Sequence, residues 1–136
     1  MGAEVITDRP GRFVAILVAT EDLVLTVTRF AAGEPGAPPH VHHEHTDTFV
    51  VVRGRLTVPL TGGQELVAGP GTAVCIPPGV VHGFRNDGPE ELEVLNAHTP
   101  GAGFDRYLRG EHPGFDQHEP PADGGLPPSL ITLARA

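Results

Sequence analysis

Residues 36–54 read GAPPHVHHEHTDTFVVVRG, in which four histidines and two acids precede an apolar run. The Thr-Phe-Val-Val-Val segment at 48–52 is rich in β-branched and aromatic side chains, which predicts a strand. Side chains two residues apart on an extended chain share a face, so His40 and His42 are expected to point the same way. A bend at Thr46 would bring the carboxylate of Asp47 to the same point. Paired imidazoles with a carboxylate are typical ligands of a transition metal.

Residues 71–86, GTAVCIPPGVVHGFRN, add a further histidine from a separate strand. The Pro-Pro-Gly at 77–79 lies between two apolar runs and predicts a strand, a tight turn and a second strand that carries His82. Residues 40–45 alone would equally fit an exposed histidine-rich loop that binds metal adventitiously. The second segment favours a built site for one divalent transition metal per chain, with Fe, Mn, Ni, Zn and Cu all compatible.

These two segments resemble the two sequence motifs of the cupin superfamily, G-(x)5-H-x-H-(x)3,4-E-(x)6-G and G-(x)5-P-x-G-(x)2-H-(x)3-N. The first motif matches at His40, His42 and Gly54, with Asp47 in the place of the glutamate. Three residues lie between Gly36 and His40, where the motif has five. The second motif matches at all of its fixed positions, which are Gly71, Pro77, Gly79, His82 and Asn86.

The resemblance implies that residues 1–136 form a single cupin domain with motifs at 36–54 and 71–86 and a C-terminal extension at 101–136. It also implies that His40, His42 and His82 are metal ligands, with Asp47 at the fourth position. The shorter aspartate leaves open whether Asp47 binds directly, through water or not at all. Three histidines with water would also suffice. The remaining substitutes for Asp47 are His43, Glu44 and His45.

Composition and turn signals predict an all-β fold of short strands. The chain holds 18 glycines and 15 prolines, as expected where many short strands are joined by turns. Strands are predicted at 4–7, 12–19, 23–30, 48–52, 56–60, 65–68, 72–76, 80–85 and 92–98, with an edge strand at 130–133. The resemblance selects a double-stranded β-helix, the jelly-roll barrel. Residues 103–110 predict a short helix that caps the barrel, and residues 112–128 predict an irregular tail.

Strand parity assigns further residues to the interior around the site. Asp47 brings Phe49 and Val51 to its face, and His82 brings Phe84. We expect these side chains to be partly pocket wall and partly ordinary core.

Two polar residues end a strand face that begins apolar, namely Asn96 and His98. They lie either at the pocket or at an exposed strand end. His98, His45 and Asp47 are the candidates for catalytic proton transfer, and Asn96 is a candidate for the substrate pocket.

Charge and hydropathy exclude several classes of partner. The net charge is −8, and all nine basic residues are arginines with no basic cluster. Nucleic acid and anionic membranes are therefore not expected partners. We expect a cytoplasmic location, since no signal-peptide pattern and no membrane-spanning apolar run occur. Strands that are apolar on both faces predict a homodimer.

Three function classes remain open. The resemblance is to short cupins similar to quercetin 2,3-dioxygenase, which implies a metal-dependent dioxygenase acting on a phenolic or enolic substrate. Other cupins that it resembles are redox-neutral, zinc-dependent polyketide cyclases and sugar isomerases. The third class is a barrel that binds a small ligand without turnover.

Overall fold

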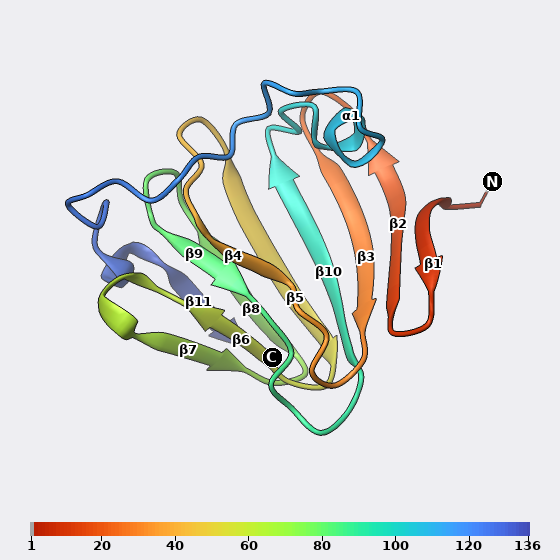
Figure 1. The fold of residues 1–136 in the computed structure, drawn as a ribbon, viewed down its shortest axis with the longest axis horizontal. Coiled ribbons are helices and arrows are strands. Elements are labelled where there is room, and N and C mark those ends of the chain that lie inside the picture. The colour runs from red at the N-terminus through yellow and green to blue at the C-terminus, as the bar shows by residue number, and fades with distance from the viewer. Residues whose placement is uncertain (1) are drawn as a thin grey trace.

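The computed structural model describes residues 2–136 as two facing layers of antiparallel strands (Figure 1). The larger layer is a seven-stranded sheet whose neighbouring strands are all antiparallel. Its order is β1 (Glu4–Arg9), β2 (Arg12–Ala19), β3 (Val24–Phe30), β10 (Leu92–Thr99), β5 (Thr46–Arg53), β8 (Thr72–Ile76) and β11 (Thr132–Arg135). The late strand β10 therefore separates the early strands β3 and β5.

The smaller layer consists of two strand pairs. One pair is β4 (Ala37–His40) with β9 (His82–Phe84), and the other is β6 (Leu56–Pro59) with β7 (Glu65–Ala68). Single bridges from Thr57 to Arg85 and from Leu60 to His82 join the two pairs. The short 3-10 helix η1 (Thr61–Gly63) connects β6 to β7. The two layers together give the predicted all-β jelly-roll arrangement, as an open sandwich of two sheets.

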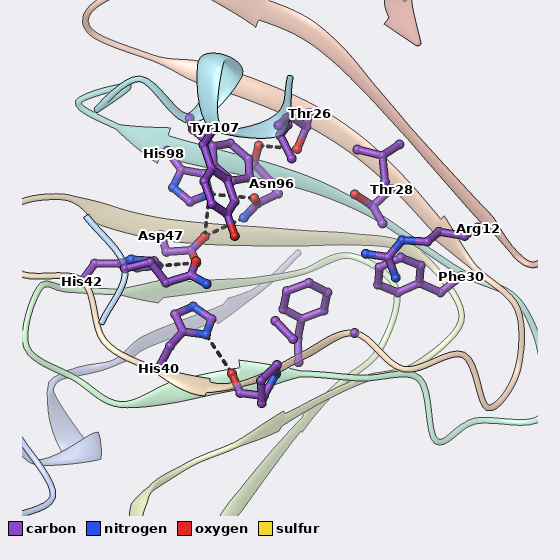
Figure 2. A pocket seen from close by; sticks show the side chains of 18 residues that line it. Arg12, Thr26, Thr28, Phe30, His40, His42, Asp47, Asn96, His98 and Tyr107 are labelled. Atoms are coloured by element: carbon purple, nitrogen blue, oxygen red, sulfur yellow. Dashed lines mark hydrogen bonds and ion pairs between the residues drawn. The ribbon is translucent and has the colours of Figure 1, made fainter. Parts of the chain in front are cut away.

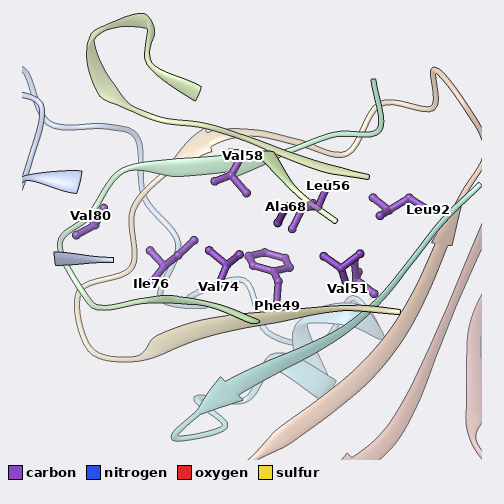
Figure 3. Close-up of a cluster of buried hydrophobic side chains, with 10 residues drawn as sticks. Phe49, Val51, Leu56, Val58, Ala68, Val74, Ile76, Val80 and Leu92 are labelled. Carbon is purple, nitrogen blue, oxygen red and sulfur yellow. The ribbon is translucent and has the colours of Figure 1, made fainter. Parts of the chain in front are cut away.

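The hydrophobic core fills the space between the layers (Figure 3). Alternate residues of β5 point inward, and Phe49 and Val51 are 2% and 1% exposed. They pack against Leu56 and Val58 of the opposite layer. Both residues were considered as pocket wall, but they lie in this core and do not line the cavity at the other end of the sandwich.

The C-terminal extension covers one end of the sandwich (Figure 1). The predicted helix is α1 (Phe104–Leu108). The tail that follows bridges from His118 to Val41, and from Gly125 to Val80. Because η2 (Pro128–Leu130) occupies the start of the predicted edge strand, β11 begins two residues later than expected. No helix within residues 2–136 has the length and apolar character needed to cross a membrane.

Candidate metal centre

Four side chains converge at the end of the sandwich beneath the C-terminal extension. His40 ends β4 and lies opposite His82 of β9, His42 follows in the next loop, and Asp47 lies on β5. All four are buried, and one ligand atom from each lies within 4.8 Å of the others. Figure 2 shows His40, His42 and Asp47 directed toward a common point. The sequence predicted this set, and the fold brings it together.

Backbone carbonyls fix the orientation of all three imidazoles. A carbonyl oxygen only accepts hydrogen bonds, so each Nδ1 carries a proton, and in the neutral ring Nε2 then keeps its lone pair. A histidine that binds a metal through one ring nitrogen usually donates the proton of the other nitrogen to such a partner, which fixes the tautomer and the ring orientation. The Nδ1 contacts are His40 to Pro38 at 2.8 Å, His42 to Asp116 at 2.7 Å and His82 to Val80 at 3.0 Å.

The donor set fits a cation. The Oδ2 atom of Asp47 lies 3.0 Å from Nε2 of His82 and 3.3 Å from Nε2 of His42. With Nδ1 protonated in both rings, these contacts would bring two nitrogen lone pairs against a carboxylate. Such an arrangement is stable only when protons or a metal ion supply positive charge between them. The residues present are therefore suited to hold a metal ion.

The protonation states also favour a metal ion. Burial, reinforced by the nearby imidazole of His82, lowers the pKa of His40 to about 4. Burial alone would raise the pKa of Asp47, but the imidazole of His98 and the contacts to His42 and His82 hold it well below its usual range. At neutral pH the site therefore presents a neutral imidazole and a carboxylate, the forms that coordinate metals.

A second set of contacts leads away from Asp47. Its Oδ1 accepts a 2.6 Å hydrogen bond from the side-chain amide of Asn96. The Asn96 Oδ1 lies 3.0 Å from Nε2 of His98, and Nδ1 of His98 lies 2.9 Å from Nε2 of His45. Nδ1 of His45 lies 2.8 Å from the Asp116 carboxylate. Five side chains thus form one continuous polar chain, with a carboxylate at each end.

Counting protons along this chain shows that the histidine pair has room for one more proton. Three contacts each need one proton. They are the contact of His98 with Asn96, the contact between the two rings, and the contact of His45 with Asp116. The Asn96 oxygen and the Asp116 carboxylate only accept hydrogen bonds, so the two rings must supply all three protons. Two neutral imidazoles carry only two protons. Burial lowers the pKa of His98 to about 4 and also lowers that of His45. The neutral pair is therefore one proton short of completing its hydrogen bonds.

A second potential ligand group consists of His42, His45 and His98, whose ligand atoms also lie within 4.8 Å of one another. It shares His42 with the first group. Because Nδ1 of His42 is bound to the Asp116 carbonyl, only its Nε2 can coordinate. The two groups therefore compete for a single ion.

A cavity of about 290 Å³ opens beside these side chains. Phe104 of α1 stacks on His98 with ring centres 3.8 Å apart and covers this end. The lining includes the expected pocket residues Phe84 and Asn96. The remaining lining residues are Arg12, Val14, Thr26, Thr28, Phe30, Gly36, Ala37, Pro38, His40, His42, Asp47, His98, Phe104, Tyr107, Leu108 and Gln117.

Sequence reasoning missed Asp116. The sequence predicts an irregular tail around this residue, yet the Asp116 carboxylate accepts hydrogen bonds from the backbone amides of His43 and Glu44 and contacts the ring of His45. His43 and Glu44 were possible substitutes for Asp47, but their side chains are exposed. Nothing in the pattern around residue 116 indicated this contact.

Comparison with known proteins agrees with the fold and the site. The Cupin domain model matches residues 26–98, more than half of the chain. This chain belongs to the cupin family. Among solved cupin-like structures, a double-stranded β-helix protein from Klebsiella pneumoniae superposes with a TM-score of 0.62. It is 26% identical, over 70% of this chain and 77% of that chain.

The similar proteins that carry a functional name include a dioxygenase and a polyketide cyclase. Quercetin 2,3-dioxygenase of Bacillus subtilis (strain 168) is 28% identical over 102 residues, which are 75% of this cupin and 29% of the relative. This cupin therefore matches less than a third of that dioxygenase. The polyketide cyclase RemF from Streptomyces resistomycificus is 27% identical, with a TM-score of 0.59 over 73% of each chain.

Proposed function

We propose that this cupin is a metal-dependent enzyme that deprotonates and oxidises a small phenolic or enolic molecule as a dioxygenase. The observation that carries the proposal is the proton-deficient pair of His45 and His98 beside a buried carboxylate and three oriented Nε2 atoms. A purely structural core needs none of these groups, and burying them unpaired is unfavourable. The weak similarity to quercetin 2,3-dioxygenase supports the same reaction class.

Each group has a distinct task in this proposal. The residues His40, His42, Asp47 and His82 hold one divalent ion. A bound Fe, Mn, Ni or Cu ion would supply an open coordination position for the substrate oxygen and for O2. The pair of His98 and His45 takes up the proton of the substrate hydroxyl, and the Asp116 carboxylate stabilises the resulting charge. Asn96 holds Asp47 in place, and Phe104 keeps water from the deprotonated substrate. Both atoms of O2 enter the product.

A redox-neutral, zinc-dependent cyclisation or isomerisation is the second candidate. It is favoured by the extent of the similarity to RemF, which spans 73% of both chains, whereas the dioxygenase match spans 29% of that relative. Three histidines and a carboxylate also suit zinc. The same histidine pair would then take a proton from a carbon next to a carbonyl. Binding of a small ligand without turnover is the remaining possibility.

Metal content and O2 uptake test the proposal. We expect about one Fe, Mn, Ni or Cu ion per purified chain by elemental mass spectrometry, and O2 consumption with quercetin or acetylacetone as probe. Zinc alone, with turnover of a polyketone and no O2 consumption, would support the second candidate instead. Absence of any bound or acquired metal would overturn both.

A His98→Gln variant separates proton transfer from metal binding. We expect it to retain its metal while losing about 10²-fold or more in kcat, the usual contribution of a general base. His112→Gln in the C-terminal extension is the matched control and should leave kcat unchanged. Full activity of the His98 variant would remove this residue from the mechanism.

A further inference from the structure

The end of the cavity away from the metal ligands contains a positive charge, on Arg12 of β2. We propose that this guanidinium binds a carboxylate on the substrate, so that the substrate is an elongated aromatic or enolic acid. Its chelating oxygens would lie at the histidines and its carboxylate at Arg12. The placement of the chelating end rests on the proposed function. The placement of the carboxylate rests on the geometry around Arg12.

Strand register separates the two ends of the cavity. Arg12 pairs with Phe30, which pairs with Leu92 of β10, while His98 at the other end of β10 pairs with Asp47. From Leu92 to His98 the chain rises by six residues, or about 20 Å at roughly 3.4 Å per residue. The long Arg12 side chain shortens this span. Figure 2 shows Arg12 on one side of the cavity and the histidines with Asp47 on the other.

The Arg12 guanidinium is held in place and retains positive charge. Its Nη1 donates to the Pro35 carbonyl at 3.0 Å, and its Cζ lies 4.5 Å from the centre of the Phe30 ring. Glu34 lies 3.8 Å away, but its carboxylate already contacts Arg9 at 2.6 Å. Glu34 contributes one negative charge and the two arginines contribute two positive charges, so the three side chains together carry a net charge of about +1.

Arg12 also retains unused hydrogen-bond donors. Within residues 2–136, its Nε and Nη2 atoms make no hydrogen bond. A planar guanidinium with two free donors is suited to a carboxylate, which accepts two parallel hydrogen bonds. Arg12 is also the only arginine among the described residues that line the cavity. In a protein with a net charge of −8, this position selects an anion locally.

The middle of the cavity fits the body of such a substrate. Val14, Phe30 and Phe84 give it apolar walls. Thr28 contributes a hydroxyl with no hydrogen bond inside the described chain, and Thr26 makes only a long 3.4 Å bond to the Asn96 carbonyl. The volume of about 290 Å³ is near the lower limit for ligand sites. One aromatic ring with a short acidic chain is therefore the expected size.

Calorimetric titration with matched acids and amides tests the proposal. The probes are 3-phenylpropionate, 5-phenylpentanoate, their 3,4-dihydroxyphenyl analogues, and the primary amide of each, titrated into the full chain as purified. We expect at least one acid to bind 10-fold or more tightly than its amide. Equal binding of every acid and its amide, or no binding of any acid, would overturn the proposal.

Two variants assign the discrimination to the guanidinium. Arg12→Met keeps the length of the side chain and its packing on Phe30, and it should abolish the preference for the acid. Arg29→Met removes an arginine of β3 that pairs with Glu93 and lies outside the cavity lining, and it should preserve the preference. Retained preference in Arg12→Met, with an unchanged circular dichroism spectrum, would contradict the assignment.

The phenylalkanoates lack the dihydroxyphenyl oxygens of the proposed substrate. Loss of the acid preference in Arg12→Met separates binding at Arg12 from binding of the carboxylate to a metal ion, so this test is independent of the proposed reaction. Discrimination of acid from amide without metal or turnover would leave the Arg12 site valid and remove the enzyme proposal. Turnover of neutral substrates without any preference for the acid would support the enzyme proposal and remove the Arg12 site.

Discussion

At the scale of single residues, Asp116 connects the C-terminal extension to the candidate metal centre. Its carbonyl fixes the ring of His42, and its carboxylate contacts the ring of His45. Burial would raise the pKa of this carboxyl, but hydrogen bonds from the His43 and Glu44 amides, together with His45, hold it below its usual range. Asp116 therefore stays ionised and orients two histidines at once.

We expect Asp116→Asn to weaken metal affinity about 10–100-fold, as is usual when a partner of a metal ligand is lost. Asparagine has a single acceptor oxygen, so it cannot serve both amides and the imidazole of His45. Competition with a chromophoric chelator measures the affinity. Asp123→Asn is the control, because Asp123 lies in the same tail and, among residues 2–136, accepts a hydrogen bond only from the Gly125 amide. Equal affinities in both variants would show that Asp116 does not act on the metal site.

Sequence reasoning succeeded at this scale where ligands are close together in the chain. His40, His42 and Asp47 lie within eight residues, so strand periodicity and one bend suffice to predict that they converge. The contact between His42 and Asp116 spans 74 residues. Such a contact depends on the path of an irregular tail, for which no periodicity exists. Arg12 was missed for a similar reason, since its role depends on a register between strands.

At the scale of elements, the pairing of β4 with β9 sets the distance between His40 and His82. The two segments approach each other unusually closely, because each has a glycine that faces a backbone carbonyl of the other. A Cβ atom on Gly36 would lie 2.1 Å from the Phe84 carbonyl oxygen, and one on Gly83 would lie 2.6 Å from the Ala37 carbonyl oxygen. The glycine that departs from the motif spacing is therefore required by this close approach.

We expect Gly36→Ala to destabilise the protein by about 1–3 kcal/mol, the usual cost of forcing added volume into a packed site. It should also weaken metal binding, because β4 must move away from β9. Thermal denaturation and metal titration measure the two effects. Gly69→Ala is the control, since a Cβ atom there meets nothing within 4 Å. Wild-type stability of Gly36→Ala would contradict the close approach of these strands.

Element types were easier to predict than element ends. The apolar segments at 12–19 and 72–76 coincide with β2 and β8. The strand predicted at 80–85 is shorter, since β9 covers only His82–Phe84. Val80 instead bridges to Gly125 of the tail, so a distant segment decides where this strand begins.

At the scale of the whole molecule, the outer face of the large sheet presents a continuous apolar row. Successive cross-strand partners from β3 to β11 form it, spaced roughly 4.8 Å apart and extending over about 19 Å. Val50 in its centre and nearby Val52 are 37% and 47% exposed. The members of the row are Val27, Leu95, Val50, Ala73 and Ala134.

We propose that a second copy of the chain covers this row, because an apolar face can pair with itself about a two-fold axis. Sedimentation equilibrium at micromolar concentration should give the mass of a dimer. Val52→Glu should shift the mass toward that of a monomer. Val67→Glu is the control, because Val67 is also exposed, at 55%, but belongs to the smaller layer. A monomeric wild-type protein would disprove the dimer.

The pattern of short alternating segments predicted two facing sheets, and the motif resemblance selected their topology. Local pattern alone could not place β10 between β3 and β5, because strand order depends on long-range pairing. Alternation did place Leu92, Val94, Asn96 and His98 on one face of β10, and all four are buried.

The position of β10 has a consequence for biosynthesis. Since β3 and β5 meet only through β10, the histidines at 40 and 42 emerge from the ribosome long before the sheet beneath them can close. Asp116, which orients His42, emerges later still. Metal acquisition should therefore follow synthesis of the C-terminal extension, so nascent chains released before residue 116 would leave the ribosome without a finished metal site.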